Sequence, residues 1–395
     1  MSDPESRVKA PDDKHGSLNH RAFGTPKVTW AVREAVGMLP HRRRRLLMLA
    51  AVVQISLGVL DLVGIALVGL VVAVAVSGIG YASIPDWAQS ILNTLGLGNL
   101  TISQLSVLIA ASAVIVLVLK SVASAYMTRR IMRFLAGAQA ELSEDLARRF
   151  LRRPLSEVQR WTTSEAIYAL GQGANSSTVG LLGSSIIVLA ELFLFGIIGI
   201  ALLAFDPIVT IFAVVFFAVI VVVLQRVVGG WAARHAAVIK ETSIETLSAV
   251  SEALLTYREA TVLDRRDLYV DRYARVIRRY ARASASMAFL TEVPKYVLEI
   301  ALYVGVVALS IFLFLTQDWG TAATTAAVFL TAGSRVVPSM LRMQGAVITA
   351  RNAAVMAQPT FFLHAQLHSV ENVTVTSSAG ELSSDERIKM RVSEM

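Results

Sequence analysis

Residues 102–151, ISQLSVLIAASAVIVLVLKSVASAYMTRRIMRFLAGAQAELSEDLARRFL, decide the fold. The first half, 102–126, is apolar and long enough to cross a bilayer, which takes about 20 residues. The same helical period continues through 127–151, where arginines and carboxylates now alternate with apolar residues. These further residues would extend a helix by about 35 Å at 1.5 Å of rise per residue. The stretch therefore predicts a membrane-spanning helix that continues far into the cytosol.

Lys and Arg are unevenly distributed, and their absence predicts the orientation of the chain. Three predicted loops, 77–104, 204–208 and 316–321, contain neither residue. Each loop joins two apolar segments that become densely basic at their other ends. Because cationic residues are retained on the cytoplasmic side of membrane spans, the three loops are expected outside the cell. We therefore predict a multi-pass protein of the cell (cytoplasmic) membrane with both termini in the cytosol.

Hydrophobic segments along the chain predict six long transmembrane helices and an all-α membrane protein. The predicted spans are 46–76, 102–126, 179–203, 208–224, 288–315 and a last one that begins at 321 and continues as a helix to 367. After spans two and four, amphipathic helices leave the membrane, reverse near 154–164 and 251–257, and return to the next span. These segments predict two long cytosolic helical hairpins.

The remaining segments complete the predicted domain organisation. Residues 1–27 are polar and without periodicity, which predicts a disordered cytosolic leader. Residues 28–45 combine a short amphipathic helix with four consecutive arginines, which predicts an interfacial elbow helix and a basic anchor. Residues 46–367 form the six-helix domain, and 368–395 are expected to be a polar cytosolic tail.

The composition excludes several classes of protein. With 55% hydrophobic and 17% charged residues, the chain is too apolar for a soluble domain, in which about 25% of residues are charged. The net charge of +8 follows the ends of the spans, so we expect contact with membrane lipid and no nucleic-acid partner. The chain has no cysteine, which excludes disulfides, thiolate metal sites and cysteine nucleophiles.

Several local strings carry a resemblance to a known family. They are DLVGIAL at 61–67, FLRRPL at 150–155, SEALLTYREA at 251–260, VPKYVLE at 293–299 and RVVPSM at 335–340. In this order, together with the six spans and two hairpins, they resemble the transmembrane domain of a six-span ABC exporter. The last two strings are closest to the branch that flips lipid-linked oligosaccharides. The resemblance implies a domain-swapped dimer, formed by two copies or by a copy and a related half-transporter.

The chain lacks the motifs of an ATPase domain. A phosphate-binding loop needs G-x-x-x-x-G-K-[ST], and no Lys in this sequence follows a Gly. A string resembling LSGGQ is also missing, and the residues after 367 are too few for an ATPase domain. The resemblance therefore implies a separate, lost or truncated ATPase, which would bind ATP and Mg. We expect no cofactor, metal or catalytic residue in this chain, which is not an enzyme on its own.

Five ionisable residues lie within the predicted spans and are candidates for a substrate path: Asp61, Lys120, Glu191, Glu299 and Arg335. Charged side chains at such depth are costly in lipid and usually face a cavity or a partner. On one hypothesis Lys120 and Arg335 meet anionic groups of the substrate through charge-assisted hydrogen bonds. On the other, the two cations pair with the three carboxylates as interhelical ties. Lys120 could also reach the cytosolic interface.

The tips of the two hairpins are candidates for coupling to an ATPase. The resemblance assigns this role to Leu155, Ser156, Glu157 and Trp161 in the first hairpin and to Glu252, Leu254, Tyr257 and Arg258 in the second. Trp161 and Tyr257 are expected as anchors, each seated in a groove of the partner so that ATPase closure moves the hairpins as rigid bodies. The alternative is that both tips are ordinary solvated turns.

These features predict the membrane-spanning subunit of an ATP-driven exporter or flippase that moves an amphipathic or lipid-linked substrate outward. One alternative is a proton-coupled secondary transporter, in which Asp61, Glu191 or Glu299 would carry protons. The other is a multi-span membrane enzyme that acts on lipid-linked substrates.

Two smaller patterns carry expectations of their own. His364 and His368 have the i, i+4 spacing of metal ligands but lack an accompanying carboxylate, so a metal site is not expected. Gly180-x-x-Gly183 and Gly196-x-x-Gly199 predict close helix packing.

Overall fold

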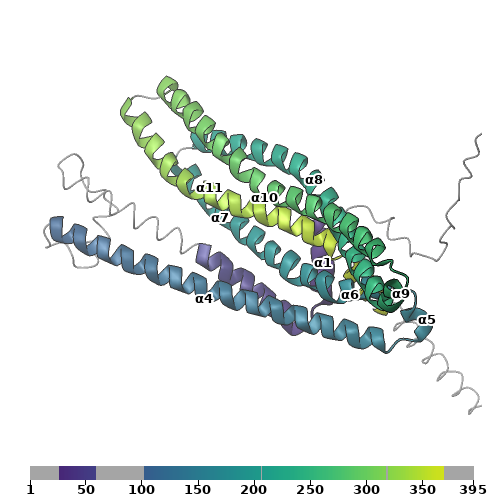
Figure 1. The fold of residues 1–395 in the computed structure, drawn as a ribbon. Coiled ribbons are helices and arrows are strands. Elements are labelled where there is room, and N and C mark those ends of the chain that lie inside the picture. Colours follow the sequence, from purple (N-terminus) through teal and green to yellow (C-terminus); the bar gives the residue numbers. More distant parts are fainter. Residues whose placement is uncertain (1–25, 59–101, 206, 317–318, 369–395) are drawn as a thin grey trace, which may run out of the picture.

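The computed structural model describes residues 26–58, 102–205, 207–316 and 319–368 (Figure 1). Within these ranges every regular element is helical, which confirms the predicted all-α fold. Three helices there are long and apolar enough to cross a membrane: Thr163–Ile200, Pro207–Leu255 and Arg266–Phe312. The chain is therefore a multi-pass membrane protein. Most of the first predicted span and outer loop, the leader to residue 25 and the tail from 369 lie outside the described residues.

The stretch that opens the sequence analysis forms a single helix. Helix α4 (Ile102–Leu151) continues without interruption for 50 residues, as its period predicts. Exposed apolar side chains lie along 114–126, and ion pairs between Arg148 and Glu144 and between Arg149 and Asp145 lie near the end of the helix. The change from an apolar to a charged surface along one helix marks where it leaves the bilayer.

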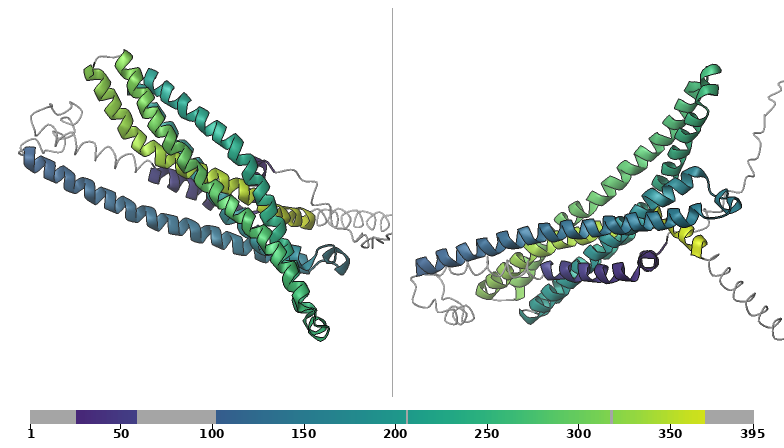
Figure 2. Two further views of the ribbon diagram at one scale, coloured as in Figure 1. Left: turned by 45° about the horizontal axis from the view of Figure 1, so that its top comes forward. Right: turned by 90° about the horizontal axis from the view of Figure 1, so that it is seen from below.

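The second hairpin consists of α8 (Pro207–Leu255), α9 (Tyr257–Val262) and α10 (Arg266–Thr316). Helices α8 and α10 lie side by side, and ion pairs Arg279–Glu245 at 3.1 Å and Arg272–Glu252 at 2.5 Å join them near the tip. Figure 2 shows that this tip extends away from the other helices. Asp264 adopts a positive φ of 51° where the chain enters α10.

The first hairpin returns to the membrane through a distorted helix. Short helices α5 (Leu155–Val158) and α6 (Thr163–Tyr168) lead into the π-helical segments η2 (Ala169–Gly173) and η3 (Ser176–Leu182), and α7 (Gly183–Phe205) follows. Two hydroxyl groups from other helices hold this stretch, because Ser143 donates to the carbonyl of Leu170 at 2.7 Å and Thr360 to that of Ala169 at 2.6 Å. The sequence predicted a regular ascending helix here. The π-helical turns depend on tertiary contacts that no local pattern carries.

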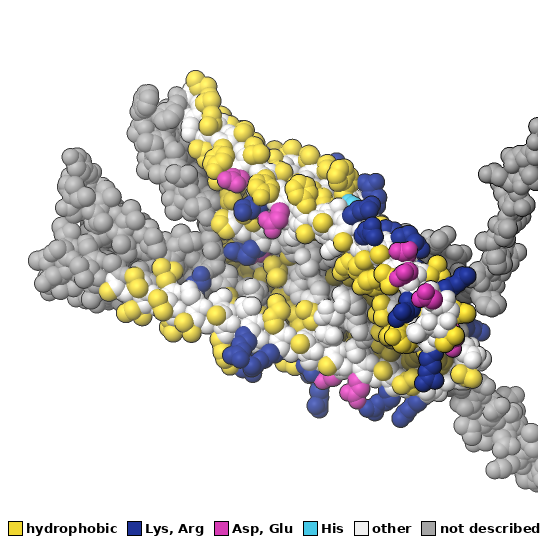
Figure 3. Space-filling view, in the orientation of Figure 1, with side chains coloured by type: hydrophobic (Ala, Val, Ile, Leu, Met, Phe, Trp, Pro, Cys, Tyr) yellow, Lys and Arg dark blue, Asp and Glu magenta, His cyan; other side chains and the backbone are white. Residues whose placement is uncertain are grey.

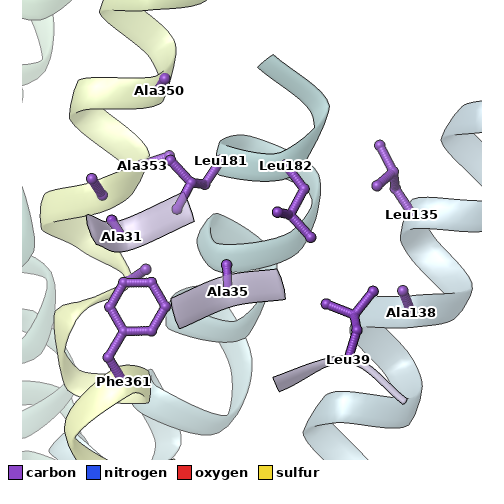
Figure 4. Close-up of a cluster of buried hydrophobic side chains, with 12 residues drawn as sticks. Ala31, Ala35, Leu39, Leu135, Ala138, Leu181, Leu182, Ala350, Ala353 and Phe361 are labelled. Carbon is purple, nitrogen blue, oxygen red and sulfur yellow. The ribbon is translucent and has the colours of Figure 1, made fainter. Parts of the chain in front are cut away.

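The last helix, α11 (Trp319–Met356), lies at the centre of the bundle and contacts α7, α8 and α10. After a turn at Ala357 the chain continues as a helix through 358–368. Helix α1 (Val28–Met38), the predicted elbow, packs across η3 and α11. Figure 4 shows the buried cluster that joins these elements to α4, with Ala31 and Ala35 lying close to Leu181, Leu182 and Phe361.

Close packing was predicted at two glycine pairs, Gly180 with Gly183 and Gly196 with Gly199, and their surroundings differ. A Cβ added at Gly180 would lie 2.9 Å from the Cβ of Ala353, and one at Gly183 would lie 3.2 Å from Leu135. The first pair therefore confirms the prediction. At Gly196 and Gly199 the described part of the chain places nothing within 4 Å of an added Cβ, so the described residues do not confirm the prediction there.

Candidate substrate path and coupling surface

A buried carboxylate ties α7 to α11. Glu191 of α7 is 8% exposed, and both of its oxygens accept hydrogen bonds from α11. Ser339 donates its hydroxyl to one oxygen, and Arg342 donates from Nε to the other at 2.5 Å. The side chain of Arg342 is 46% exposed, so its guanidinium reaches the edge of the buried site. A charged partner and a hydroxyl together satisfy a carboxylate that would otherwise be costly to bury.

This tie revises the sequence-based prediction for Glu191. On the hypothesis of interhelical ties the expected partners were Lys120 and Arg335, whereas Arg342 forms the ion pair. Ser339 and Arg342 are three residues apart on one helical face, a spacing that could have pointed to a shared partner. Lys120 is partly buried on α4. Asp61 and the side chain of Arg335 lie outside the described residues.

A second set of polar contacts joins α8 to α11. Gln225 donates from Nε2 to the side-chain oxygen of Gln344, and Arg351 donates to the backbone carbonyl of Gln225 at 3.0 Å. Gly229 makes room for this arginine, because an added Cβ would lie 1.3 Å from its Nη1. Further along α8, Lys240 donates at 2.7 Å to Gln358, which lies just after α11. Burial lowers the pKa of this lysine. We call Ser339, Arg342, Gln344 and Arg351 the α11 polar seam.

Glu299 lies apart from this seam. It is exposed on α10, where the hydroxyl of Tyr303 donates to its carboxylate at 3.0 Å. Glu191 is enclosed between α7 and α11, so the two described acidic candidates face different surroundings. Among the described residues, the structure does not gather the predicted path residues into one cluster.

The first hairpin tip differs from the prediction in one residue. Helix α5 carries Leu155, which is 70% exposed, together with Ser156 and Glu157. Trp161 instead is 7% exposed, because its ring packs against Phe150 and Phe362. Its Nε1 donates to Gln366 at 2.9 Å. The structure therefore corrects the expectation that Trp161 is presented to a partner, since its aromatic surface is used inside the chain.

The second hairpin tip presents a larger apolar surface. Leu254 is 70% exposed and Tyr257 is 56% exposed. Leu255 and Val262, which the sequence analysis did not select, are each 84% exposed. The Glu252 side chain is held by its ion pair with Arg272. Large apolar side chains gathered at the end of a projecting hairpin are typical of a surface that contacts another protein.

Comparisons with known proteins identify the fold. No protein-family model and no curated protein matches the chain. A solved structure of a bacterial Atm1-family ABC exporter with ATP bound matches with a TM-score of 0.61 over 82% of this chain, at 14% sequence identity. The chain has the fold of an ABC exporter transmembrane domain. It spans about half of the length of that exporter, of which 53% is covered.

The helical segment after α11 carries one group with a clearly shifted pKa. His364 is half-buried and lies beside His368, with the two ring centroids 4.3 Å apart. Burial, reinforced by the neighbouring charges of His368 and Arg149, lowers the pKa of His364 to about 4. Within the described ranges, no three His, Cys, Asp or Glu residues group as metal ligands.

This shift predicts that the protein loses stability in mild acid. An unfolded histidine has a pKa near 6.5. Between that value and about 4 the unfolded chain binds a proton that the folded chain does not, so stability falls as the pH is lowered. We expect a loss of about 1 kcal/mol between pH 7 and pH 4.5, after allowing for partial exposure. Unfolding of the detergent-solubilised protein should show this fall, and His364→Gln should reduce it. The matched change at the exposed His41, His41→Gln, should leave it unaltered; an equal effect of both would contradict the assignment.

Proposed function

We propose that this chain is the membrane-spanning subunit of an ATP-driven ABC exporter, paired with a second copy or a related half and powered by a separate ATPase chain that binds ATP and Mg. The observation that carries the proposal is the exposed apolar surface at the hairpin tips of an ABC exporter transmembrane fold. Leu155 on the first hairpin and Leu254 and Tyr257 on the second would remain in water without a partner.

The proposed mechanism uses the hairpins as levers. Both termini and both tips would lie in the cytosol, in agreement with the loops that lack Lys and Arg. ATP binding would draw the two ATPase chains together and turn the attached hairpins as rigid bodies. The helix bundles would then close toward the cytosol and open outward, and hydrolysis would reset them.

The proposed cargo is an amphipathic or lipid-linked molecule moved outward. The strings at 293–299 and 335–340 support the flippase-like branch, because they resemble its sequences most closely. The α11 polar seam supports a path for polar groups, since it sets charged and amide side chains between membrane-spanning helices.

Co-purification tests the proposal. The tagged chain, extracted from its native membranes in mild detergent, should carry with it an ATPase chain whose Mg-ATP hydrolysis responds to reconstitution in lipid. Outward transport in vesicles should require ATP. Transport driven by a proton gradient without ATP would favour the secondary transporter instead, and turnover of a lipid-linked substrate by the isolated chain would favour the membrane enzyme.

Substitutions at the tips test the coupling surface. Replacing Leu155 and Tyr257 together by Ala should lower ATP-dependent transport at least tenfold, because both exposed anchors are lost. Membrane insertion should be unchanged. The control is Met132→Ala on α4, an exposed apolar side chain far from both tips, which should keep full transport. Normal transport by the double variant would remove these residues from the coupling surface.

A further inference from the structure

Helix α10 carries a polar stripe at membrane depth. Its members are Glu292, Lys295, Tyr296, Glu299 and Tyr303, all of them exposed. At about 100° of rotation per residue they fall within an arc of about 100°. Figure 3 shows acidic and basic side chains interrupting an otherwise hydrophobic surface in the region of α10. We call this set the α10 polar stripe.

The stripe lies opposite the side of α10 that packs into the protein. Leu290, Leu298 and Ala301 are buried, and their positions on the helix centre about 180° away from the stripe. Between these two sides lies an exposed apolar face, formed by Phe289, Ile300, Val304, Val307 and Ile311. The apolar face suits lipid. The stripe does not, because charged side chains in the hydrocarbon face water or a partner.

The stripe leads from the cytosolic boundary into the bilayer. Glu299 is 17 residues before the end of α10 at Thr316, or about 25 Å along the helix. With the predicted outer loop 316–321 at the outer boundary of the hydrocarbon core, which is about 30 Å thick, Glu299 lies inside the core. Tyr303 lies one turn deeper, and Glu292 lies at about 36 Å, near the cytosolic boundary. A polar group can therefore be in contact with the stripe from the cytosol to the middle of the membrane.

The chemistry of the stripe favours a cation. Residues 283–316 contain two glutamates and one lysine, which gives a net charge of −1 in each chain. Tyr303 donates to one carboxylate oxygen of Glu299, and this exposed carboxylate can accept further hydrogen bonds from a ligand. Lys295 lies with its ammonium 5.9 Å from the ring centroid of Tyr296, the distance at which an aromatic ring attracts a cation. Carboxylates beside tyrosine rings are the groups that recognise organic cations.

We propose that the α10 polar stripe is one wall of a substrate site, completed by a second copy of this chain, that binds an amphipathic organic cation. The second copy follows from the proposed function, on which this inference rests. Two stripes facing a shared water-filled space would carry a net charge of −2, and the adjoining apolar side chains would contact the hydrophobic body of the ligand.

Binding of two lipophilic ions of similar shape tests the proposal. The protein in nanodiscs should bind tetraphenylphosphonium at least tenfold more tightly than tetraphenylborate. Replacing Glu292 and Glu299 together by Gln should weaken tetraphenylphosphonium binding by about tenfold, since two charge-assisted contacts are lost. Lys295→Gln should strengthen it by about threefold, a gain that misfolding cannot produce. Asp271→Asn removes the same charge from the exposed cytosolic part of α10 and should change nothing. Equal binding of both ions, or no effect of the glutamate changes, would overturn the proposal.

Labelling tests the placement of the stripe independently. The chain has no cysteine, so each introduced cysteine is a unique probe. Glu299→Cys should react with a water-soluble maleimide at least tenfold faster than Val304→Cys on the apolar face. Equal rates would show that the stripe faces lipid. Neither experiment needs ATP or an ATPase chain. A negative result would therefore argue against the stripe and not against the exporter proposal. Conversely, failure to find an ATPase chain would not alter the binding and labelling results.

Discussion

Replacing Arg342 by Met should lower the free energy of unfolding by about 2–3 kcal/mol. The change leaves Glu191, which is 8% exposed, without its charged partner and with only the hydroxyl of Ser339. Breaking a fully buried ion pair costs about 3–5 kcal/mol. The lower range applies here because the Arg342 side chain is 46% exposed and its charge is partly screened. Unfolding of the purified protein by SDS in mixed micelles, followed by tryptophan fluorescence, measures this loss.

A second variant separates the ion pair from general damage to α11. Replacing Glu191 by Gln in the Arg342→Met background removes the unpaired charge, so most of the lost stability should return. The double variant should lie within about 1 kcal/mol of the original protein, as expected when both partners of an ion pair are replaced. If the double variant is as unstable as the single one, the pair is not what joins α7 to α11.

The long helices could be predicted from the sequence because their signals are local. The period of α4 and the positions of Pro207 and the second tip placed the helix ends close to those observed. An apolar stretch that continues as an amphipathic helix has few structural alternatives. The same argument gave the two hairpins and the class of fold.

The contacts of the candidate site could not be predicted, because they join residues far apart in sequence. Glu191 and Arg342 are 151 residues apart, and only the packing of α7 on α11 selects this arginine over Arg335. Trp161 was expected to anchor the first hairpin tip in a groove of a partner ATPase. Phe362 and Gln366, which return from the other end of the chain, bury it instead.

The α10 polar stripe could be predicted only in part, since its residues are evident in the sequence but the side of the helix on which they lie is not. Glu299 was selected from the sequence as a charge in an apolar span. Whether Glu299 faces the protein interior or the surface depends on which side of α10 packs inward, and this could not be predicted from the sequence. Once Leu298 and Ala301 are known to be buried, the polar positions fall on the opposite side of the helix.

Replacing Gly180 by Leu should destabilise the protein by about 3 kcal/mol, because the helices that meet there cannot separate without losing their shared core. An added Cβ alone would lie 2.9 Å from the Cβ of Ala353, which is fixed to the backbone of α11 and cannot rotate away. Overpacking of this kind typically costs about 1–3 kcal/mol, and the larger side chain falls at the upper end. The displaced segments, η3 and α11, also hold α1 through the cluster in Figure 4.

A matched glycine in α7, the helix that directly continues η3, provides the control. Gly196→Leu introduces the same side chain where the described residues place nothing within 4 Å, so stability should stay the same or rise slightly through the better helix propensity of Leu. A compensating change sharpens the test: Gly180→Ala should be destabilising alone and should recover in combination with Ala353→Gly, which removes the opposing Cβ. Equal effects of Leu at positions 180 and 196, or no recovery in the double variant, would show that close approach at Gly180 does not hold η3 against α11.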